Sequence, residues 1–187
     1  MMSPSPWKRI LAFALDYLIV AAYMAVVSLL TWAVSHTAAG PALAGLFADP
    51  LAAQITIVAT VTLPVVLCFA LLESSPRQAT WGKWQMHLRV VSVDGGRPGR
   101  GRALVRSLVK FLPWELAHTC LWRVPGWPLD PQEPPWPVYA GFGLVWLLAL
   151  VYLAGLFVGE KRQTLYDRLA RTRVLSAQAG TRGDFRP

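Results

Sequence analysis

Residues 10–31 read ILAFALDYLIVAAYMAVVSLLT, an apolar stretch long enough to cross a bilayer that carries one acid, Asp16, in its interior. A carboxylate near the middle of such a helix costs about 2.5–3.5 kcal/mol on insertion scales, so the folded protein must offset that cost. Arg9 and Tyr23 lie seven residues before and after Asp16, almost two helical turns in each direction. We therefore expect one polar stripe that faces protein or water rather than lipid.

The composition is that of an integral membrane protein. The 187 residues are 55% hydrophobic and only 15% charged, and their mean hydropathy is +0.41. The net charge of +8 could suggest a nucleic-acid partner, but the basic residues lie between apolar segments, which favours anionic lipid headgroups and no nucleic acid. Cys68 and Cys120 both lie in apolar segments, so no disulfide framework or Cys-based zinc site is expected.

Four segments are apolar enough to be interpreted as membrane spans, at about 10–31, 55–72, 103–122 and 138–158. The third span has an alternative interpretation as an amphipathic helix in the interface, because Pro113 interrupts it and it carries Arg106, Lys110, Glu115 and His118. Segments rich in Lys and Arg stay in the cytoplasm. Four crossings place all of the 18 Lys and Arg residues except Arg123 on that side, with Arg106 and Lys110 snorkelling to the headgroups.

The sequence therefore predicts an all-α membrane protein, a single domain over 1–187 built from two helical hairpins. Both termini are predicted to be cytoplasmic. Basic cytoplasmic segments at 73–102 and 159–187 follow the two hairpins, and each is expected to contain a short interfacial helix and a strand.

The two basic segments share a weak internal repeat. Aligning Thr80 with Thr164 also superimposes Val90 on Val174 and places each segment after a helical hairpin, so a two-fold internal plan is expected. The strands of the two segments, 88–93 and 172–177, are expected to pair with each other.

Three motifs follow one another along the chain. Arg9 and Asp16 lie in WKRILAFALDYLI, a T-x-G-K element begins at Thr80 and leads to a D-G-G turn at Asp94, and T-L-x-D-R-L-A-x-T begins at Thr164. Together they resemble the RDD family of bacterial membrane proteins, named for one arginine and two aspartates. The resemblance covers residues from Trp7 to about Val174.

The resemblance implies a multi-pass protein of the bacterial inner membrane, for which transport of ions or other ligands has been suggested. Carried over residue by residue, the defining trio is Arg9, Asp16 and Asp167. The motif positions of the cytoplasmic module are Thr80, Gly82, Lys83, Arg89, Asp94, Gly95, Thr164, Arg168 and Thr172. The chain departs from the usual pattern at residues 84–87, where a more basic or Gly-containing turn often follows the lysine, and at Arg171, where the family commonly has glycine.

Each member of the trio has two interpretations. Asp16 is either a carboxylate that exchanges a proton or cation, or a buried hydrogen-bonded acid that fixes helix packing. Arg9 at a helix entrance is favoured as a snorkelling anchor. Asp167 lies three residues after Thr164, the spacing of a capping box, and its alternative is a salt bridge to Arg9 or Arg89.

Further polar residues inside the spans suggest packing or a relay. Glu115 and His118 share a helix face, as a hydrogen-bonded pair or as a proton relay with Asp16 and Tyr23. Glu115 and Asp16 differ in depth by roughly 9 Å, counted at 1.5 Å per residue. Thr60 is expected to compensate the carbonyl that Pro64 leaves without a donor. No metal cluster is expected, because His36, His87 and His118 are scattered along the chain.

The favoured function is transport of a cation or proton past Asp16. One copy of four helices encloses little space, so a homo-oligomer is expected. The alternative is a non-catalytic membrane partner or assembly factor that docks another membrane protein. The sequence contains no phosphate loop, nucleophile elbow or other catalytic set, so neither enzyme activity nor a cofactor is expected.

Overall fold

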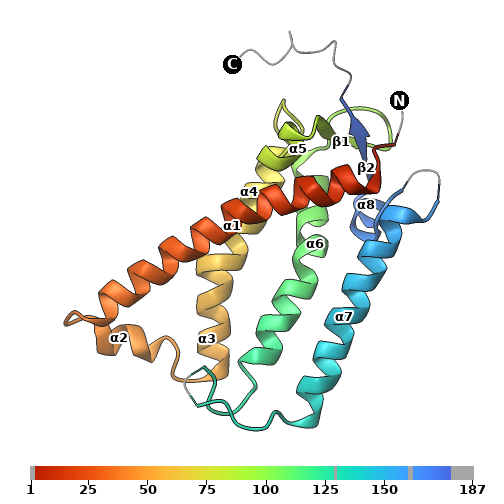
Figure 1. Cartoon of the computed structure of the whole chain (residues 1–187). Coiled ribbons are helices and arrows are strands. Elements are labelled where there is room, and N and C mark those ends of the chain that lie inside the picture. Colours follow the sequence, from red (N-terminus) through yellow and green to blue (C-terminus); the bar gives the residue numbers. More distant parts are fainter. Residues whose placement is uncertain (1–2, 129, 160–161, 178–187) are drawn as a thin grey trace. The chain divides into compact units, whose positions relative to one another are not determined.

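The computed structural model describes residues 3–128, 130–159 and 162–177, and most of them are helical (Figure 1). In chain order the elements are α1 Pro6–Ser35, α2 Gly40–Gly45, α3 Pro50–Ile57, the π-helix η1 Val58–Thr62, α4 Leu63–Glu73, α5 Trp81–Gln85, β1 Leu88–Ser92, α6 Arg100–Leu121, α7 Trp136–Phe157, α8 Leu165–Leu169 and β2 Thr172–Ser176. The predicted basic segment 159–187 lies partly outside the described residues, at 160–161 and 178–187.

Three helical stretches are long and apolar enough to cross a membrane: Pro6–Ser35, Pro50–Glu73 and Trp136–Phe157. They contain the predicted spans 10–31 and 55–72 and most of 138–158. The second stretch starts earlier than predicted, because the Asp49 side chain accepts hydrogen bonds from the Leu51 and Ala52 amides and Pro50 occupies the first helical position. The predicted helix at 103–122 is also present as α6, which is less apolar.

The described chain forms two compact units, each assembled from separate segments. Of the described residues, the first unit comprises 3–19, 66–110, 150–159 and 162–177, and the second comprises 20–65, 111–128 and 130–149. The sequence was expected to form a single domain. In the second unit a small apolar cluster joins Cys120 and Val124 to Val138 of α7.

The first unit contains the predicted internal repeat as two similar modules. Shifting the first module by 84 residues, the difference between Thr80 and Thr164, superimposes α5 on α8 and β1 on β2. The left-handed backbone positions also coincide: φ is 53° at Gln78 and 43° at the equivalent Arg162. The two-fold plan of the modules is therefore confirmed in the backbone.

The two strands pair, as predicted, and lie side by side in Figure 1. Strands β1 and β2 are antiparallel, and Val90 is the partner of Val174, so two equivalent positions of the repeat face each other. Leu88 and Val174 pack with Ala12 of α1 in a small apolar cluster, which attaches the sheet to the first helix. The pairing therefore brings the ends of two distant chain segments to α1.

Local sequence explains why each module has a short helix. Thr80 and Thr164 adopt extended backbone conformations before α5 and α8. Each helix then ends with a residue in the left-handed region, His87 with φ 54° and Arg171 with φ 53°. Glycine adopts this conformation at the least cost, so His87 and Arg171 occupy backbone positions that would suit glycine better.

A glycine permits the close approach of α5 to α1. A Cβ atom on Gly82 would lie 2.1 Å from the Ala12 carbonyl oxygen and 2.9 Å from the Asp16 amide nitrogen. Real contacts of this kind do not fall below about 3 Å, so only glycine fits without displacing α5. Gly155 plays a similar part on α7, where a Cβ would lie 2.8 Å from the Thr164 Cα.

Two tyrosines compensate the two prolines inside long helices. Pro64 and Pro113 have no amide hydrogen to donate, and the carbonyls of Thr60 and Val109 lie four residues before them, at the α-helical hydrogen-bond spacing. The turn before Pro64 is itself π-helical. The Tyr23 hydroxyl donates to the Thr60 carbonyl, and the Tyr152 hydroxyl donates to the Val109 carbonyl. Each broken helix is therefore supported by a side chain from another helix.

The expectation that Thr60 itself compensates Pro64 is wrong. The Thr60 hydroxyl donates to the Thr56 carbonyl, 2.7 Å away, one turn before the proline break. A serine or threonine hydroxyl commonly bonds this carbonyl of its own helix, which leaves the later carbonyl to another donor. Tyr23, predicted as part of a polar stripe, supplies that donor.

Replacing Gly82 with alanine is predicted to displace α5 from α1, because the new methyl group would overlap the Ala12 carbonyl. The variant should lose most of its folded population or melt at a clearly lower temperature in detergent. The matched control is Gly101→Ala in α6, where a Cβ meets nothing within 4 Å. Equal melting temperatures for the two variants would contradict the packing argument.

Removing the Tyr23 hydroxyl with Tyr23→Phe is predicted to cost about 0.5–1.5 kcal/mol of unfolding free energy. The same change should cost less in a Pro64→Ala background, because alanine at this position restores an amide donor for the Thr60 carbonyl. A double-mutant cycle, read from denaturant unfolding in detergent, measures the difference. An identical cost of Tyr23→Phe in both backgrounds would show that the hydroxyl does not serve this carbonyl.

Candidate functional site: a buried ring of charges

Six charged side chains of the first unit form a continuous series of ion pairs. In order the links are Arg9–Asp167 at 2.6 Å, Asp167–Arg106 at 3.0 Å, Arg106–Glu73 at 2.5 Å, Glu73–Lys83 at 2.9 Å and Lys83–Asp16 at 3.8 Å. Positive and negative groups alternate along the series. Arg9 and Asp16, its two ends, both lie on α1, so the helix backbone closes the series into a ring.

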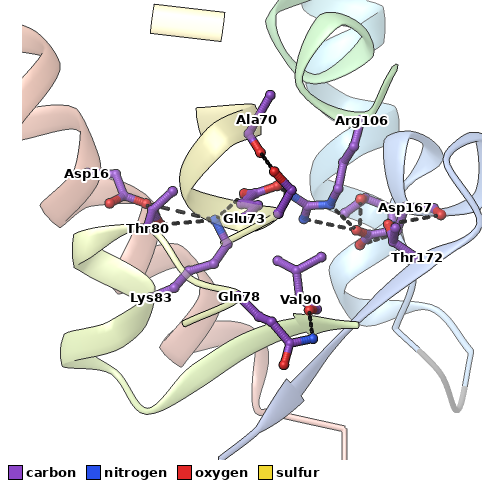
Figure 2. A network of polar contacts seen from close by, with 12 residues as sticks. Asp16, Ala70, Glu73, Gln78, Thr80, Lys83, Val90, Arg106, Asp167 and Thr172 are labelled. Atoms are coloured by element: carbon purple, nitrogen blue, oxygen red, sulfur yellow. Dashed lines mark hydrogen bonds and ion pairs between the residues drawn. The ribbon is translucent and has the colours of Figure 1, made fainter. Parts of the chain in front are cut away.

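Five separate elements supply these residues, which we call the charged ring: α1, α4, α5, α6 and α8. Figure 2 shows Lys83 between Asp16 and Glu73, and Arg106 reaching from Glu73 to Asp167. The ring therefore connects helices that are far apart in the sequence through side chains alone.

Because the ring residues are buried, the ring is stable only if their charges balance. The relative exposures of the ring residues are 0% for Glu73 and Asp167, 1% for Arg106, 3% for Asp16, and 8% for Arg9 and Lys83. An isolated buried charge would cost several kcal/mol even after relaxation. Three acids and three bases in alternation leave the ring without net charge, and each ion has at least one opposite neighbour.

Both carboxylate oxygens of Asp16 accept hydrogen bonds from the start of α5. The Thr80 hydroxyl donates to Oδ2 at 2.6 Å, and the Gly82 amide donates to Oδ1 at 2.7 Å. A carboxylate at a helix start also suits the exposed amides there. The Lys83 ammonium adds a longer contact at 3.8 Å. These contacts offset the cost of placing this acid inside an apolar helix.

Asp167 makes both of the contacts that were predicted as alternatives. It forms a capping box with Thr164, and it pairs with Arg9 at 2.6 Å. Burial alone would raise the pKa of Asp167, but the guanidinium groups of Arg106 and Arg9 outweigh burial and hold that pKa below its usual range. The carboxylate is therefore charged at neutral pH.

The two modules carry opposite charges at equivalent positions. Lys83 of α5 and Asp167 of α8 are related by the 84-residue shift that separates Thr80 and Thr164. Lys83 contacts two acids, Glu73 and Asp16, whereas Asp167 contacts two bases. Because Arg106 joins Glu73 to Asp167, the excess charge around one module cancels the excess around the other.

The structure brings together four of the site residues named from the sequence: Arg9, Asp16, Lys83 and Asp167. Thr80 and Gly82 bond Asp16, while Thr164 and Thr172 bond Asp167. Other motif residues lie closer to the surface. Arg168 is exposed on α8, Arg89 is half-buried on β1, and Gly95 adopts φ 92° beside Asp94, which pairs with Arg102.

Sequence reasoning missed two ring members as site residues. Glu73 ends α4 directly after the apolar run, and Arg106 lies near the start of α6. The predicted snorkelling of Arg106 and Lys110 is wrong, because Arg106 is buried in the ring and the Lys110 ammonium lies 3.8 Å from the centroid of the Phe69 ring. The anchor role favoured for Arg9 is also wrong, because its side chain is buried. A lone acid at the end of an apolar span is the sequence signal that could have identified Glu73.

The predicted relay residues belong to the second unit, except Asp16. Glu115 accepts hydrogen bonds from Thr62 and Gln54, so the predicted bond between Glu115 and His118 is wrong. His118 instead packs its ring against Trp114, with centroids 5.1 Å apart. Among the described residues, no three His, Cys, Asp or Glu side chains gather as a group that could hold a metal ion.

Asp167→Asn is predicted to destabilise the protein by about 3–5 kcal/mol, because it leaves two buried guanidinium groups without their shared acid. Thermal unfolding in detergent measures the loss. The control is Asp94→Asn, which removes the exposed partner of Arg102 and should leave the melting temperature close to that of the wild type. Similar losses of melting temperature in the two variants would show that burial does not determine how much an ion pair contributes to stability.

Asp167 also predicts the direction of the response to acid. Its folded-state pKa lies below the unfolded value of about 3.9, so its contribution is complete above that value and declines as the pH falls toward the folded-state pKa. The stability difference between wild type and Asp167→Asn should stay constant from pH 7 to about 5 and shrink below about 4. A difference that grows on acidification would contradict this sign.

One of three comparisons with known proteins gives a match. No curated protein and no solved structure matches the chain. A comparison with protein families matches residues 3–171 to the RDD family, a range that includes all six ring residues and ends just before β2 of the second module. The chain therefore belongs to the RDD family.

Proposed function

We propose that this RDD-family protein transports a proton or small cation across the bacterial inner membrane, by way of carboxylates inside its helices. It acts without enzymatic chemistry. The observation that carries the proposal is the burial of Asp16 with its ring partners, because an ionisable group within a membrane helix is costly and marks a candidate ion pathway.

Four crossings with cytoplasmic termini are part of the proposal. The first unit contains the start of α1, the end of α4, the start of α6 and the end of α7. Thus α6 passes from one unit to the other just as the three apolar stretches do. The charges that make α6 less apolar include Arg106, which is neutralised within the ring. This supports α6 as the fourth span.

The weakest link of the ring indicates where an ion would exchange. Lys83 and Asp16 are 3.8 Å apart, whereas the other links measure 2.5–3.0 Å. A proton or cation that reaches Asp16 competes with Lys83 for one carboxylate oxygen. Lys83 keeps its 2.9 Å contact with Glu73 during that exchange, so the rest of the ring stays paired.

The surface around the first unit suits the inner face of a membrane. Trp7, Trp81 and Trp84 are exposed, and indole rings favour the headgroup region. The basic residues of this unit would then lie next to anionic lipid headgroups. A single copy offers little enclosed space, so the transporting form is proposed to be a homo-oligomer.

A second candidate function rests on the same ring. Four of its five links are short, and Asp16 also accepts two hydrogen bonds, which is the pattern of a fixed structural centre. In this candidate the protein is a non-catalytic membrane partner or assembly factor, and the ring only holds its helix ends together.

Ion flux in proteoliposomes distinguishes the two candidates. Wild-type protein should dissipate an imposed H⁺, Na⁺ or K⁺ gradient. Asp16→Asn should reduce the rate at least tenfold, because the neutral amide still accepts from the Gly82 amide but no longer attracts a cation. Asp94→Asn is the matched control and should transport normally, because its side chain is exposed.

Only protein that elutes as a single folded species is compared. Absence of flux for all three ions in wild-type liposomes would overturn the transport proposal. Unchanged flux in Asp16→Asn would remove Asp16 from the pathway.

A further inference from the structure

Glu115 is an acid within a long helix that does not belong to the charged ring. It is half-buried in α6, two residues after Pro113. Among the residues that the structure describes, no Lys, Arg or His side chain forms an ion pair with it. Its hydrogen-bond partners are neutral donors: the Thr62 hydroxyl at 2.7 Å and the Gln54 amide at 3.4 Å.

The side chains that donate hydrogen bonds to this carboxylate are neutral and also carry oxygen atoms. The Gln54 amide nitrogen also donates to the Thr119 hydroxyl at 2.5 Å, so Thr62, Glu115, Gln54 and Thr119 form one connected cluster within the second unit. Arg123 donates to the Gln54 amide oxygen at a long 3.4 Å and to the Thr119 carbonyl at 2.7 Å. The cluster thus offers a carboxylate, two hydroxyls and an amide carbonyl.

The backbone is irregular on both sides of this cluster. Thr62 is the last residue of the π-helix η1, and Pro64 follows in α4. Glu115 follows the proline of α6 by two residues. Single π-turns occur frequently at functional sites, and broken helices at membrane depth commonly form ion sites. This is a second observation, independent of the side chains, that points to binding.

We infer that Glu115, Thr62, Thr119 and Gln54 form a binding site for a monovalent metal cation of the Na⁺ type. All four provide oxygen atoms, which are the preferred ligands of such hard cations. One carboxylate balances a single positive charge. A divalent ion would leave an excess charge in an apolar segment, beside the cationic Arg123.

Gln54 gives the site a means of exchange. To bind the cation, its amide turns so that the oxygen rather than the nitrogen faces Glu115, and the long contact with Arg123 is released. Arg123 and the cation therefore compete for the same oxygen atom. This inference rests on the proposed transport function and adds a second carboxylate to it, in the other compact unit.

Cation-dependent thermal unfolding of the full-length protein in detergent tests the site, with NaCl replaced by choline chloride at constant ionic strength. The melting temperature of the wild type should rise with Na⁺ and saturate, because only the folded state forms the site. Glu115→Gln should raise the Na⁺ concentration for a half-maximal effect at least tenfold. Thr62→Val should weaken binding, and Arg123→Gln should strengthen it.

The matched control is Glu133→Gln, which neutralises an exposed acid and should respond to Na⁺ like the wild type. If Glu115→Gln does not fold, Thr62→Val carries the test, since it replaces only a hydroxyl by a methyl group. The inference is overturned if Na⁺, Li⁺ and K⁺ all leave the wild-type melting temperature unchanged. It is also overturned if the folded variants at Glu115 and Thr62 keep the wild-type response.

Binding and flux separate this inference from the proposed function. Saturable Na⁺ binding that requires Glu115, without flux in liposomes, would retain the site and reject transport. Flux that is unaffected by Glu115→Gln, together with absence of Na⁺ stabilisation, would retain transport and reject the site.

Discussion

The constraint on which the first unit depends is the cost of burying six ions. Each ion would lose several kcal/mol of solvation if it were isolated, and the attraction of its neighbours offsets that loss only when the geometry is close. Alternation around the charged ring gives every ion an opposite partner, and the short helices α5 and α8 supply additional hydrogen bonds to the acids. The arrangement of these segments follows from that requirement, because each must deliver one ion to one place.

The need for neutrality also explains why the modules differ in sequence despite a common backbone. Each central charge, at position 83 or 167, contacts two opposite charges on the long helices. Two identical modules would therefore leave the same sign of charge in excess around both positions. With Lys83 in one module and Asp167 in the other, the excess is negative around Lys83 and positive around Asp167. The Arg106–Glu73 pair joins the two groups, so the charges cancel. The backbone is thus repeated within the chain while its central charge is inverted.

Sequence patterns predicted the local features well. Apolar length predicted the helices, the Thr80 and Thr164 alignment predicted two similar modules, and strand propensity predicted the pairing of 88–93 with 172–177. These features depend on neighbours within a few residues or on a visible repeat. The capping box at Thr164 and Asp167 was predicted for the same reason.

Long-range partners could not be predicted in the same way. The ring joins Arg9 to a residue 158 positions away, and a side chain's charge alone does not tell whether it will meet lipid headgroups or another ion. Arg106 and Lys110 were assigned to the headgroups on that ground, although tertiary packing buries Arg106. The support of Pro64 by Tyr23 rather than Thr60 is the same kind of error, because the partner comes from another helix.

The two compact units solve the problem of polar groups in apolar helices by different means, and the difference bears on their roles. In the first unit opposite charges satisfy one another, so displacing one ion leaves another uncompensated and motion is unfavourable. In the second unit Glu115 relies on hydroxyl and amide groups, which can turn from donor to acceptor without leaving a buried charge unpaired. Groups of the latter kind suit exchange of an ion at Glu115, whereas within the ring only the long Lys83–Asp16 link can open while the other pairs stay intact. The chain thus satisfies its buried polar groups by ion pairing in one unit and by neutral hydrogen bonds in the other.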